Sequence, residues 1–235
     1  MENFENIYLL KGIRGANVYL LYTSGELTLI DTGLKGQADK ILIKIKDLGF
    51  DAGRLKHIII THAHSDHTGS AKALTEKTSA RILAHQHEIP FLEKTKPLPA
   101  ASRLAALFTR LEKWIMPAVP PVSVQKSLKD GENLDILGGL QVIHTPGHTP
   151  GAICLYQPKQ KILFCGDTLF NQNPATGRKG LRLPIKAFTS DQETARKSVK
   201  KLTEFSIETL FFGHGEPIME KGTERLKELL TQTYY

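Results

Sequence analysis

The same strand pattern occurs twice in the chain, and this repeat limits the folds open to it more than any other feature. Residues 17–31 (NVYLLYTSGELTLID) predict a β-hairpin, because β-branched and aromatic runs flank a Ser24-Gly25 turn. Residues 152–167 (AICLYQPKQKILFCGD) predict a second hairpin, and both stretches end in an aspartate followed by threonine. One shared pattern does not prove a duplication, but it favours two similar halves.

Each hairpin is followed by helical and strand patterns. After the first come a helix over 36–48, the buried strand HIIIT (57–61), a short helix (70–78) and a strand (80–84).

After the second hairpin, Ser190 and Glu193 fit a capping box that opens a helix to about Phe205. A strand at 208–212 and an amphipathic helix at 219–232 complete this half. Strands followed by helices in both halves predict an α/β protein, built as a four-layer αββα sandwich of two similar halves.

One segment falls outside the repeat. Six prolines between Pro90 and Pro121 surround an amphipathic stretch, so we expect a helical insertion at about 90–125 in a single domain spanning 1–235. Apolar residues of 100–116 share one helical face, which leaves three roles open for this helix: packing on the core, a lid, or the surface of a homodimer.

Composition narrows the class of protein. The chain has 31 Lys and Arg against 24 Asp and Glu, and the net charge of +7 leaves a nucleic-acid partner open at this point. Two cysteines make neither a disulfide framework nor a CxxC motif. No apolar run of about 18 residues predicts a membrane span, and the N-terminus lacks the features of a secretory signal. We therefore expect a cytoplasmic protein.

The stretch THAHSDHTG (61–69) carries the strongest chemical signal. It follows the predicted buried strand, and groups at the carboxyl ends of strands form the sites of α/β sheets. Its imidazoles and carboxylate are ligands of a divalent ion such as zinc. Further candidates end later strands, and the full set is His62, His64, Asp66, His67, His148, Asp167 and His214. Seven ligands are too many for one tetrahedral ion and suit two ions.

The motif H-x-H-x-D-H, followed by a lone His, an Asp and a final His, resembles the metallo-β-lactamase superfamily, whose fold is an αββα sandwich. The resemblance runs from Asp31 in LIDTG to His214. It implies that His62, His64 and His148 hold a first metal ion, that Asp66, His67 and His214 hold a second, and that Asp167 bridges them. It also implies that Asp31 supports the site from behind the ligands.

Within that superfamily the chain is similar to the glyoxalase II and acyl-homoserine-lactonase branches, since it keeps Asp167 and has the segment GDTLF (166–170). It lacks the Gly-Cys-Gly element common in glyoxalase II. Where lactonases usually carry a tyrosine it has Phe170, a candidate substrate contact that cannot donate a hydrogen bond. A second candidate contact is Arg178, in a cluster with Lys179, Arg182 and Lys186 that could hold a substrate carboxylate or phosphate.

These residues predict a dinuclear metal-dependent hydrolase that uses metal-bound hydroxide on a small ester, thioester or lactone. Asp66 is the expected catalytic group, both a ligand and a local proton acceptor. Zinc is the expected metal, with iron and manganese as alternatives.

Two other functions stay open: a phosphodiesterase or nuclease, and an iron-dependent oxidoreductase of the same fold. A small-molecule substrate is the expected partner. No membrane partner is expected, and nucleic acid is disfavoured because the 178–186 cluster lacks interleaved aromatics.

Four histidines are not expected to take part. His85 and His87 form another H-x-H pair, but no acidic residue follows at metal-ligating spacing, so we expect a surface or strand-end role. His57 and His144 precede a strand and a turn respectively, and we expect both to be structural.

Overall fold

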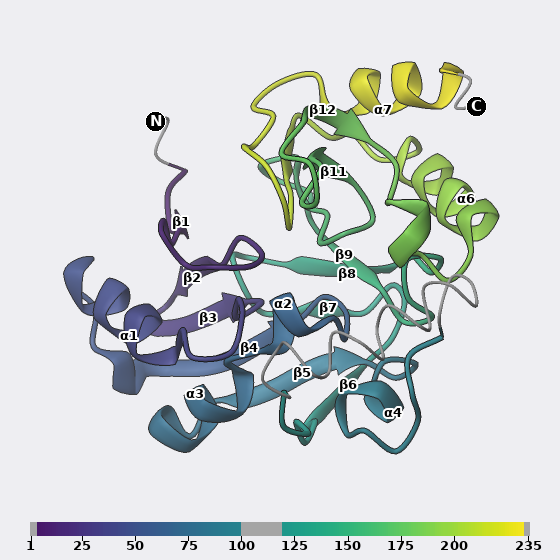
Figure 1. The fold of residues 1–235 in the computed structure, drawn as a ribbon. Coiled ribbons are helices and arrows are strands. Elements are labelled where there is room, and N and C mark those ends of the chain that lie inside the picture. Colours follow the sequence, from purple (N-terminus) through teal and green to yellow (C-terminus); the bar gives the residue numbers. More distant parts are fainter. Residues whose placement is uncertain (1–3, 100–118, 233–235) are drawn as a thin grey trace.

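The computed structural model describes residues 4–99 and 119–232, which form four layers (Figure 1). Two β-sheets pack face to face, and helices cover the outer face of each. The helices on the first sheet are α1 (Ala38–Asp47) and α3 (Ala71–Thr78), and those on the second are α6 (Gln192–Leu202) and α7 (Gly222–Thr231). The αββα sandwich expected from the sequence is confirmed.

The first sheet has six strands in sequence order. Strands β1 to β3 are antiparallel, and β3 to β6 run parallel to one another. Their bounds are β1 (Ile7–Leu9), β2 (Tyr19–Thr23), β3 (Glu26–Ile30), β4 (Leu55–Ile60), β5 (Arg81–His85) and β6 (Lys126–Leu128).

The second sheet has five strands in the order β13-β10-β9-β8-β7, and only β10 and β13 pair in parallel. Its strands are β7 (Asn133–Leu134), β8 (Leu140–His144), β9 (Ile153–Gln157), β10 (Ile162–Phe164) and β13 (Thr209–Phe211). A separate hairpin pairs β11 (Phe170–Gln172) with β12 (Lys179–Arg182). The short helices are α2 (Ser65–Thr68) and α4 (Ile89–Leu92), with 3-10 turns at Ala52–Arg54 and Lys186–Phe188.

Alternation along the strand explains why the last three residues of β4 are all apolar. Ile58 and Ile60 pack outward with the residues beneath α1, whereas Ile59 points inward to the layer between the sheets. In that inner layer Leu155 and Phe164 belong to the second sheet. A strand buried on both faces needs apolar residues at every position, so the continuous run HIIIT was a reliable signal.

The N-terminal cap of α6 differs from the sequence expectation. The residue that caps this helix is Asp191, whose side chain accepts from the backbone N–H of Thr194; the predicted cap, Ser190, was wrong. Ser190 instead donates its hydroxyl proton to the carbonyl of His148. The helix expected at 100–116 falls in 100–118, outside the described residues, and the single domain with an insertion at 90–125 stays a prediction.

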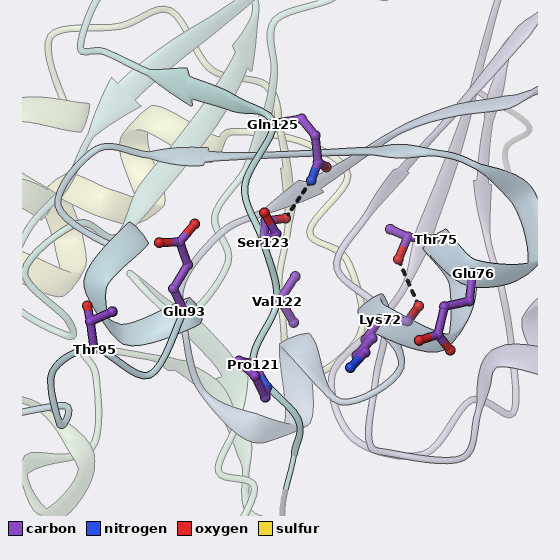
Figure 2. A pocket seen from close by; sticks show the side chains of 9 residues that line it. All are labelled: Lys72, Thr75, Glu76, Glu93, Thr95, Pro121, Val122, Ser123 and Gln125. Carbon is purple, nitrogen blue, oxygen red and sulfur yellow. Dashed lines mark hydrogen bonds between the residues drawn. The ribbon is translucent and has the colours of Figure 1, made fainter.

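A pocket of about 580 Å³ lies beside α3 on the outside of the sandwich. Figure 2 shows Val122 in its middle, with Glu93 on one side and Lys72 and Glu76 of α3 on the other. None of the seven predicted metal ligands lines it. Within 4–99 and 119–232, no helix is long and apolar enough to cross a membrane.

Candidate metal centre

The seven predicted ligands lie together at one edge of the sandwich, where strands from both sheets end. Four of them follow β4: His62 and His64 lie between this strand and α2, and Asp66 and His67 lie on α2. The other three follow strands of the second sheet: His148 after β8, Asp167 after β10 and His214 after β13. The fold therefore brings together residues up to about 150 positions apart.

Three histidines form the first group. His64 Nδ1 lies 3.1 Å from His62 Nε2 and 2.9 Å from His148 Nε2. Nitrogens that share one tetrahedral zinc ion at about 2.05 Å are separated by about 3.3 Å. The three imidazoles are thus close to the arrangement that a single ion requires.

Hydrogen bonds behind these rings assign their tautomers. The hydroxyl of Thr61 donates to Asp31 Oδ2 at 2.8 Å, so it accepts from His62 Nδ1 at 3.1 Å. The hydroxyl of Thr189 likewise donates to a backbone carbonyl and accepts from His148 Nδ1 at 3.3 Å. In both rings Nδ1 therefore carries the proton. Nε2 keeps its lone pair, which faces the other histidines of the first group, as in metal-ligating histidines.

The second group consists of Asp66, His67 and His214. His214 Nε2 lies 3.1 Å from Asp66 Oδ2, and His67 Nε2 lies 3.9 Å from the same oxygen. The other ring nitrogen of His67, Nδ1, is 2.7 Å from Asp31 Oδ2. Asp31 therefore contacts His67 through the ring nitrogen that does not face Asp66, and its support of a metal site stays a prediction.

Asp167 lies between the two groups. Its Oδ1 is 3.2 Å from His67 Nε2, and its Oδ2 is 3.5 Å from His214 Nε2. The same Oδ2 is 3.6 Å from His148 Nε2 and 3.8 Å from His62 Nε2. One carboxylate thus faces both sets of nitrogens.

Buried polar atoms without partners point to what the cluster holds. His67 Nε2, Asp167 Oδ1 and His214 Nε2 are buried and make no hydrogen bond within the described chain. Buried polar groups are rarely left unsatisfied, because each one costs about 1–3 kcal/mol. Nitrogen and carboxylate donors that converge without partners fit divalent metal ions.

The two groups differ in charge. Burial and the neighbouring imidazoles hold the pKa of His62 well below its usual value and lower that of His148 to about 3, so both rings are neutral at pH 7. In the second group burial acts the same way, but the carboxylates of Asp167, Asp31 and Asp66 outweigh it and raise the pKa of His67. Asp167 and Asp66 likewise raise the pKa of His214 to about 9 against burial. The imidazoles of the second group therefore hold positive charge beside carboxylates, whereas His62 and His148 of the first group are neutral.

Glu88 supports this centre, although no sequence motif marks it. Its side chain is fully buried, with Oε2 accepting from the backbone N–H of Ala63 at 2.8 Å and Oε1 from that of Gly151 at 2.7 Å. Ala63 lies between His62 and His64, and Gly151 ends the turn that carries His148. One carboxylate thus joins the two backbone segments of the first group. Burial raises its pKa to about 7.

Gly213 also belongs to the centre. A Cβ atom there would overlap Asp167 Oδ1 and lie 2.8 Å from His67 Cε1. The GHG motif places this glycine directly before His214. Because the backbone passes so close to the ligands here, only a residue without a side chain fits.

The two candidate substrate contacts lie on the β11–β12 hairpin. Phe170 is buried, with its ring stacked on His214 at 5.5 Å and lying 6.0 Å from His148. Arg178 is exposed in the turn that joins the strands. Contact of either residue with a substrate stays a prediction.

The four histidines set aside in the sequence are placed differently from one another. His57 is half-buried on β4 and joins no group of potential metal ligands in the described ranges. His85, His87 and His144 do come together, in a cluster separate from the seven residues above. The sequence predicted a surface or strand-end role for His85 and His87 and a structural role for His144. It did not predict that the three converge, because they come from strands of different sheets.

Comparison with known proteins agrees with this geometry. The family model described as "Metallo-beta-lactamase superfamily" matches residues 12–214. The probable metallo-hydrolase YflN of Bacillus subtilis (strain 168) is 30% identical, with the match covering 90% of this chain and 87% of that protein. A hydroxyacylglutathione hydrolase of Pseudomonas aeruginosa (strain LESB58) is 36% identical, over 50% of this chain and 34% of that protein.

A solved structure shows the same architecture. The metallo-beta-lactamase family protein TTHA1429 from Thermus thermophilus matches with a TM-score of 0.72 and 26% identity. The match covers 97% of this chain and 79% of that one.

Proposed function

Because the chain belongs to the metallo-beta-lactamase superfamily, we propose that it is a dinuclear metal-dependent hydrolase acting on a small ester, thioester or lactone. The observation that carries this proposal is the position of Asp167, whose carboxylate lies within 3.8 Å of ligand nitrogens from both groups. A bridging carboxylate between two nitrogen-rich groups suits a pair of ions that share one substrate.

In this proposal His62, His64 and His148 hold one ion, and Asp66, His67 and His214 hold the other. Zinc fits the nitrogen and oxygen donors best, while iron and manganese are the alternatives that the same donors accept. When bound, two such ions polarise the scissile carbonyl and lower the pKa of water at the site to about 7.

Asp66 is the residue placed to move a proton. About a third of its side chain is exposed, whereas that of Asp167 is almost fully buried, so Asp66 is the carboxylate that solvent and substrate can reach. Burial opposes ionisation of Asp66, but His67 and His214 outweigh it and hold the pKa of the carboxyl well below its usual value. An ionised Asp66 can accept a proton and pass it to the leaving group.

The substrate class is inferred from one relative and from the surroundings of the centre. The name of that relative, hydroxyacylglutathione hydrolase, describes removal of an acyl group from glutathione, and the match covers 50% of this chain. The β11–β12 hairpin that carries the buried Phe170 also presents exposed Arg178 and Lys179. A carbonyl substrate with an anionic group elsewhere in the molecule fits this combination.

A hydrolysis panel tests the proposal. Thioesters, lactones, phosphodiesters and a β-lactam are offered to the metal-loaded protein, and the His62→Ala/Asp167→Ala double variant serves as the blank. We expect turnover of a carbonyl substrate that disappears in the blank. Turnover of phosphodiesters alone would replace the proposal with a phosphodiesterase. Visible absorbance of anaerobically purified protein, together with no hydrolysis, would favour an iron oxidoreductase instead.

A further inference from the structure

A second cluster of imidazoles lies outside the proposed dinuclear centre. His85 ends β5 in the first sheet, His87 lies in the following turn, and His144 ends β8 in the second sheet. The ring centroids of His85 and His144 are 4.0 Å apart, and the ring of His87 lies 5.0 and 5.4 Å from them. One ligand nitrogen from each of the three lies within 4.8 Å of the others.

We propose that His85, His87 and His144 form a third metal site, which binds a divalent ion of the zinc or copper type more weakly than the dinuclear centre does. Imidazole nitrogen is a preferred ligand of these ions. Three such nitrogens leave a fourth position for water, which completes a tetrahedral site. The site joins the two sheets, because its ligands come from both.

The ring of His144 is already oriented for this role. Its Nε2–H donates to the carbonyl of Pro150 at 2.9 Å, so Nδ1 keeps its lone pair. Metal-ligating histidines almost always donate their second ring nitrogen to such an acceptor. Among the described residues, the lone pair of His85 Nδ1 accepts one hydrogen bond, at 3.3 Å from the backbone N–H of His87, which an ion would replace.

The charge state of the cluster suits a metal ion. Burial and the neighbouring rings of His144 and His87 lower the pKa of His85 to about 4, and burial also lowers that of His144. Both are therefore neutral at pH 7, the form that binds metal. The charged groups beside them, Asp130 and Lys201, form an ion pair at 2.9 Å, so their charges largely cancel.

One feature sets the metal affinity of this cluster below that of the first group. The planes of His85 and His144 are only 14° apart, so the stacked rings must tilt before both can face one ion. His85 is buried, but His87 is exposed and can turn without repacking the core. Binding would tie β5 to the 144–151 segment, which also carries His148.

Zinc stoichiometry in excess metal tests the site. Untagged, zinc-loaded protein is dialysed to equilibrium at pH 7.5 against a series of zinc concentrations, and bound zinc is measured by mass spectrometry. We expect a third equivalent in the wild type and in the His57→Ala control, and its loss in His87→Ala with the first two ions retained. Two equivalents in the wild type at every concentration, or a third that persists in His87→Ala, would overturn the proposal.

Thermal unfolding gives a second readout from the same samples. An ion that binds the native state stabilises it by mass action, so excess zinc should raise the Tm of the wild type and of His57→Ala beyond the value reached with two ions. His87→Ala should show no such further rise. An equal rise in all three proteins would place the extra binding elsewhere. The proposed hydrolysis does not enter this test, so either idea can fail without the other.

Discussion

Asp31 and His67 are 36 positions apart in the sequence, yet their side chains share a 2.7 Å hydrogen bond in the buried interior. Asp31 follows β3, the second strand of the first hairpin, and its Oδ1 also accepts from the backbone N–H of Thr61 at 2.9 Å. One carboxylate thus fixes both the start of the ligand loop and the ring of a proposed ligand.

Asp31→Asn should weaken binding of the second ion most, with a smaller effect on the first ion through the Thr61 hydroxyl that contacts His62. The amide can still accept from Thr61, but its NH₂ group faces the protonated Nδ1 of His67, so the ring loses its orienting partner. Loss of such a partner typically lowers metal affinity about 10–100-fold. Zinc affinity measured by chelator competition checks this, with the exposed Asp51→Asn as a control that should leave both ions unchanged. Equal affinities in Asp31→Asn and the wild type would show that the contact does not support the site.

Glu88→Gln should loosen the first group. One backbone N–H, at Ala63 or Gly151, would then face an NH₂ group in place of a carboxylate oxygen, and the segments that carry His64 and His148 would separate. We expect about a 10-fold loss of zinc affinity at pH 7.5. Glu132→Gln, which removes a partly exposed ion pair with Lys126, is the matched control. A loss of the same size in both variants would count against a positioning role for Glu88.

The pH dependence of stability offers a separate test of Glu88. Burial raises the pKa of its carboxyl from the usual value of 4.5 to about 7 in the folded chain. Because the pKa is higher in the folded than in the unfolded chain, Glu88 contributes to the free energy of unfolding in full below pH 4.5. This contribution is lost as the pH rises through 7. In metal-free protein, the unfolding free energy of the wild type should therefore fall relative to Glu88→Gln as the pH rises from 4.5 through 7. A difference that stays constant over this range would contradict the assignment.

Gly213→Ala should disturb the candidate metal centre by steric overlap. The added methyl group overlaps Asp167 and crowds His67, so the backbone or the ligands must shift. We expect loss of tightly bound metal, measured by elemental analysis after dialysis. Gly49→Ala is the control, because it strains a backbone with φ of 84° by about 1–2 kcal/mol but meets no atom within 4 Å. If metal content fell equally in both variants, the loss would come from lower stability of the fold and not from overlap with the ligands.

Much of the fold followed from local pattern. The two hairpins, the strand HIIIT and the helices after them were predicted near their observed positions, because alternation and helical spacing reflect which face of an element is buried. Strands of two to four residues such as β1, β7 and β12 were not predicted, because so few residues cannot show the alternation of apolar and polar side chains that marks a strand. Asp191 was missed as the N-terminal cap of α6 because Ser190 and Glu193 have the spacing of a capping box, which predicts a cap one position earlier.

The candidate ligands were easier to predict than their supports. His62, His64, Asp66 and His67 are close together in sequence, and the remaining candidates each follow a strand, so type and position both mark them. Glu88 carries no such mark, because its role is to accept two backbone N–H groups that only the folded chain brings together. The His85, His87 and His144 cluster was missed for the same reason: its members come from different sheets.

The central claim is a pair of ions bridged by Asp167, and metal content tests it most directly. Protein reconstituted with zinc and dialysed against metal-free buffer should retain about two ions per chain in the wild type and in the exposed control Asp39→Ala. Asp167→Ala should retain one or fewer, because both groups lose a shared ligand. A wild type that binds no metal after reconstitution, or an Asp167→Ala variant that still holds two ions, would contradict the account.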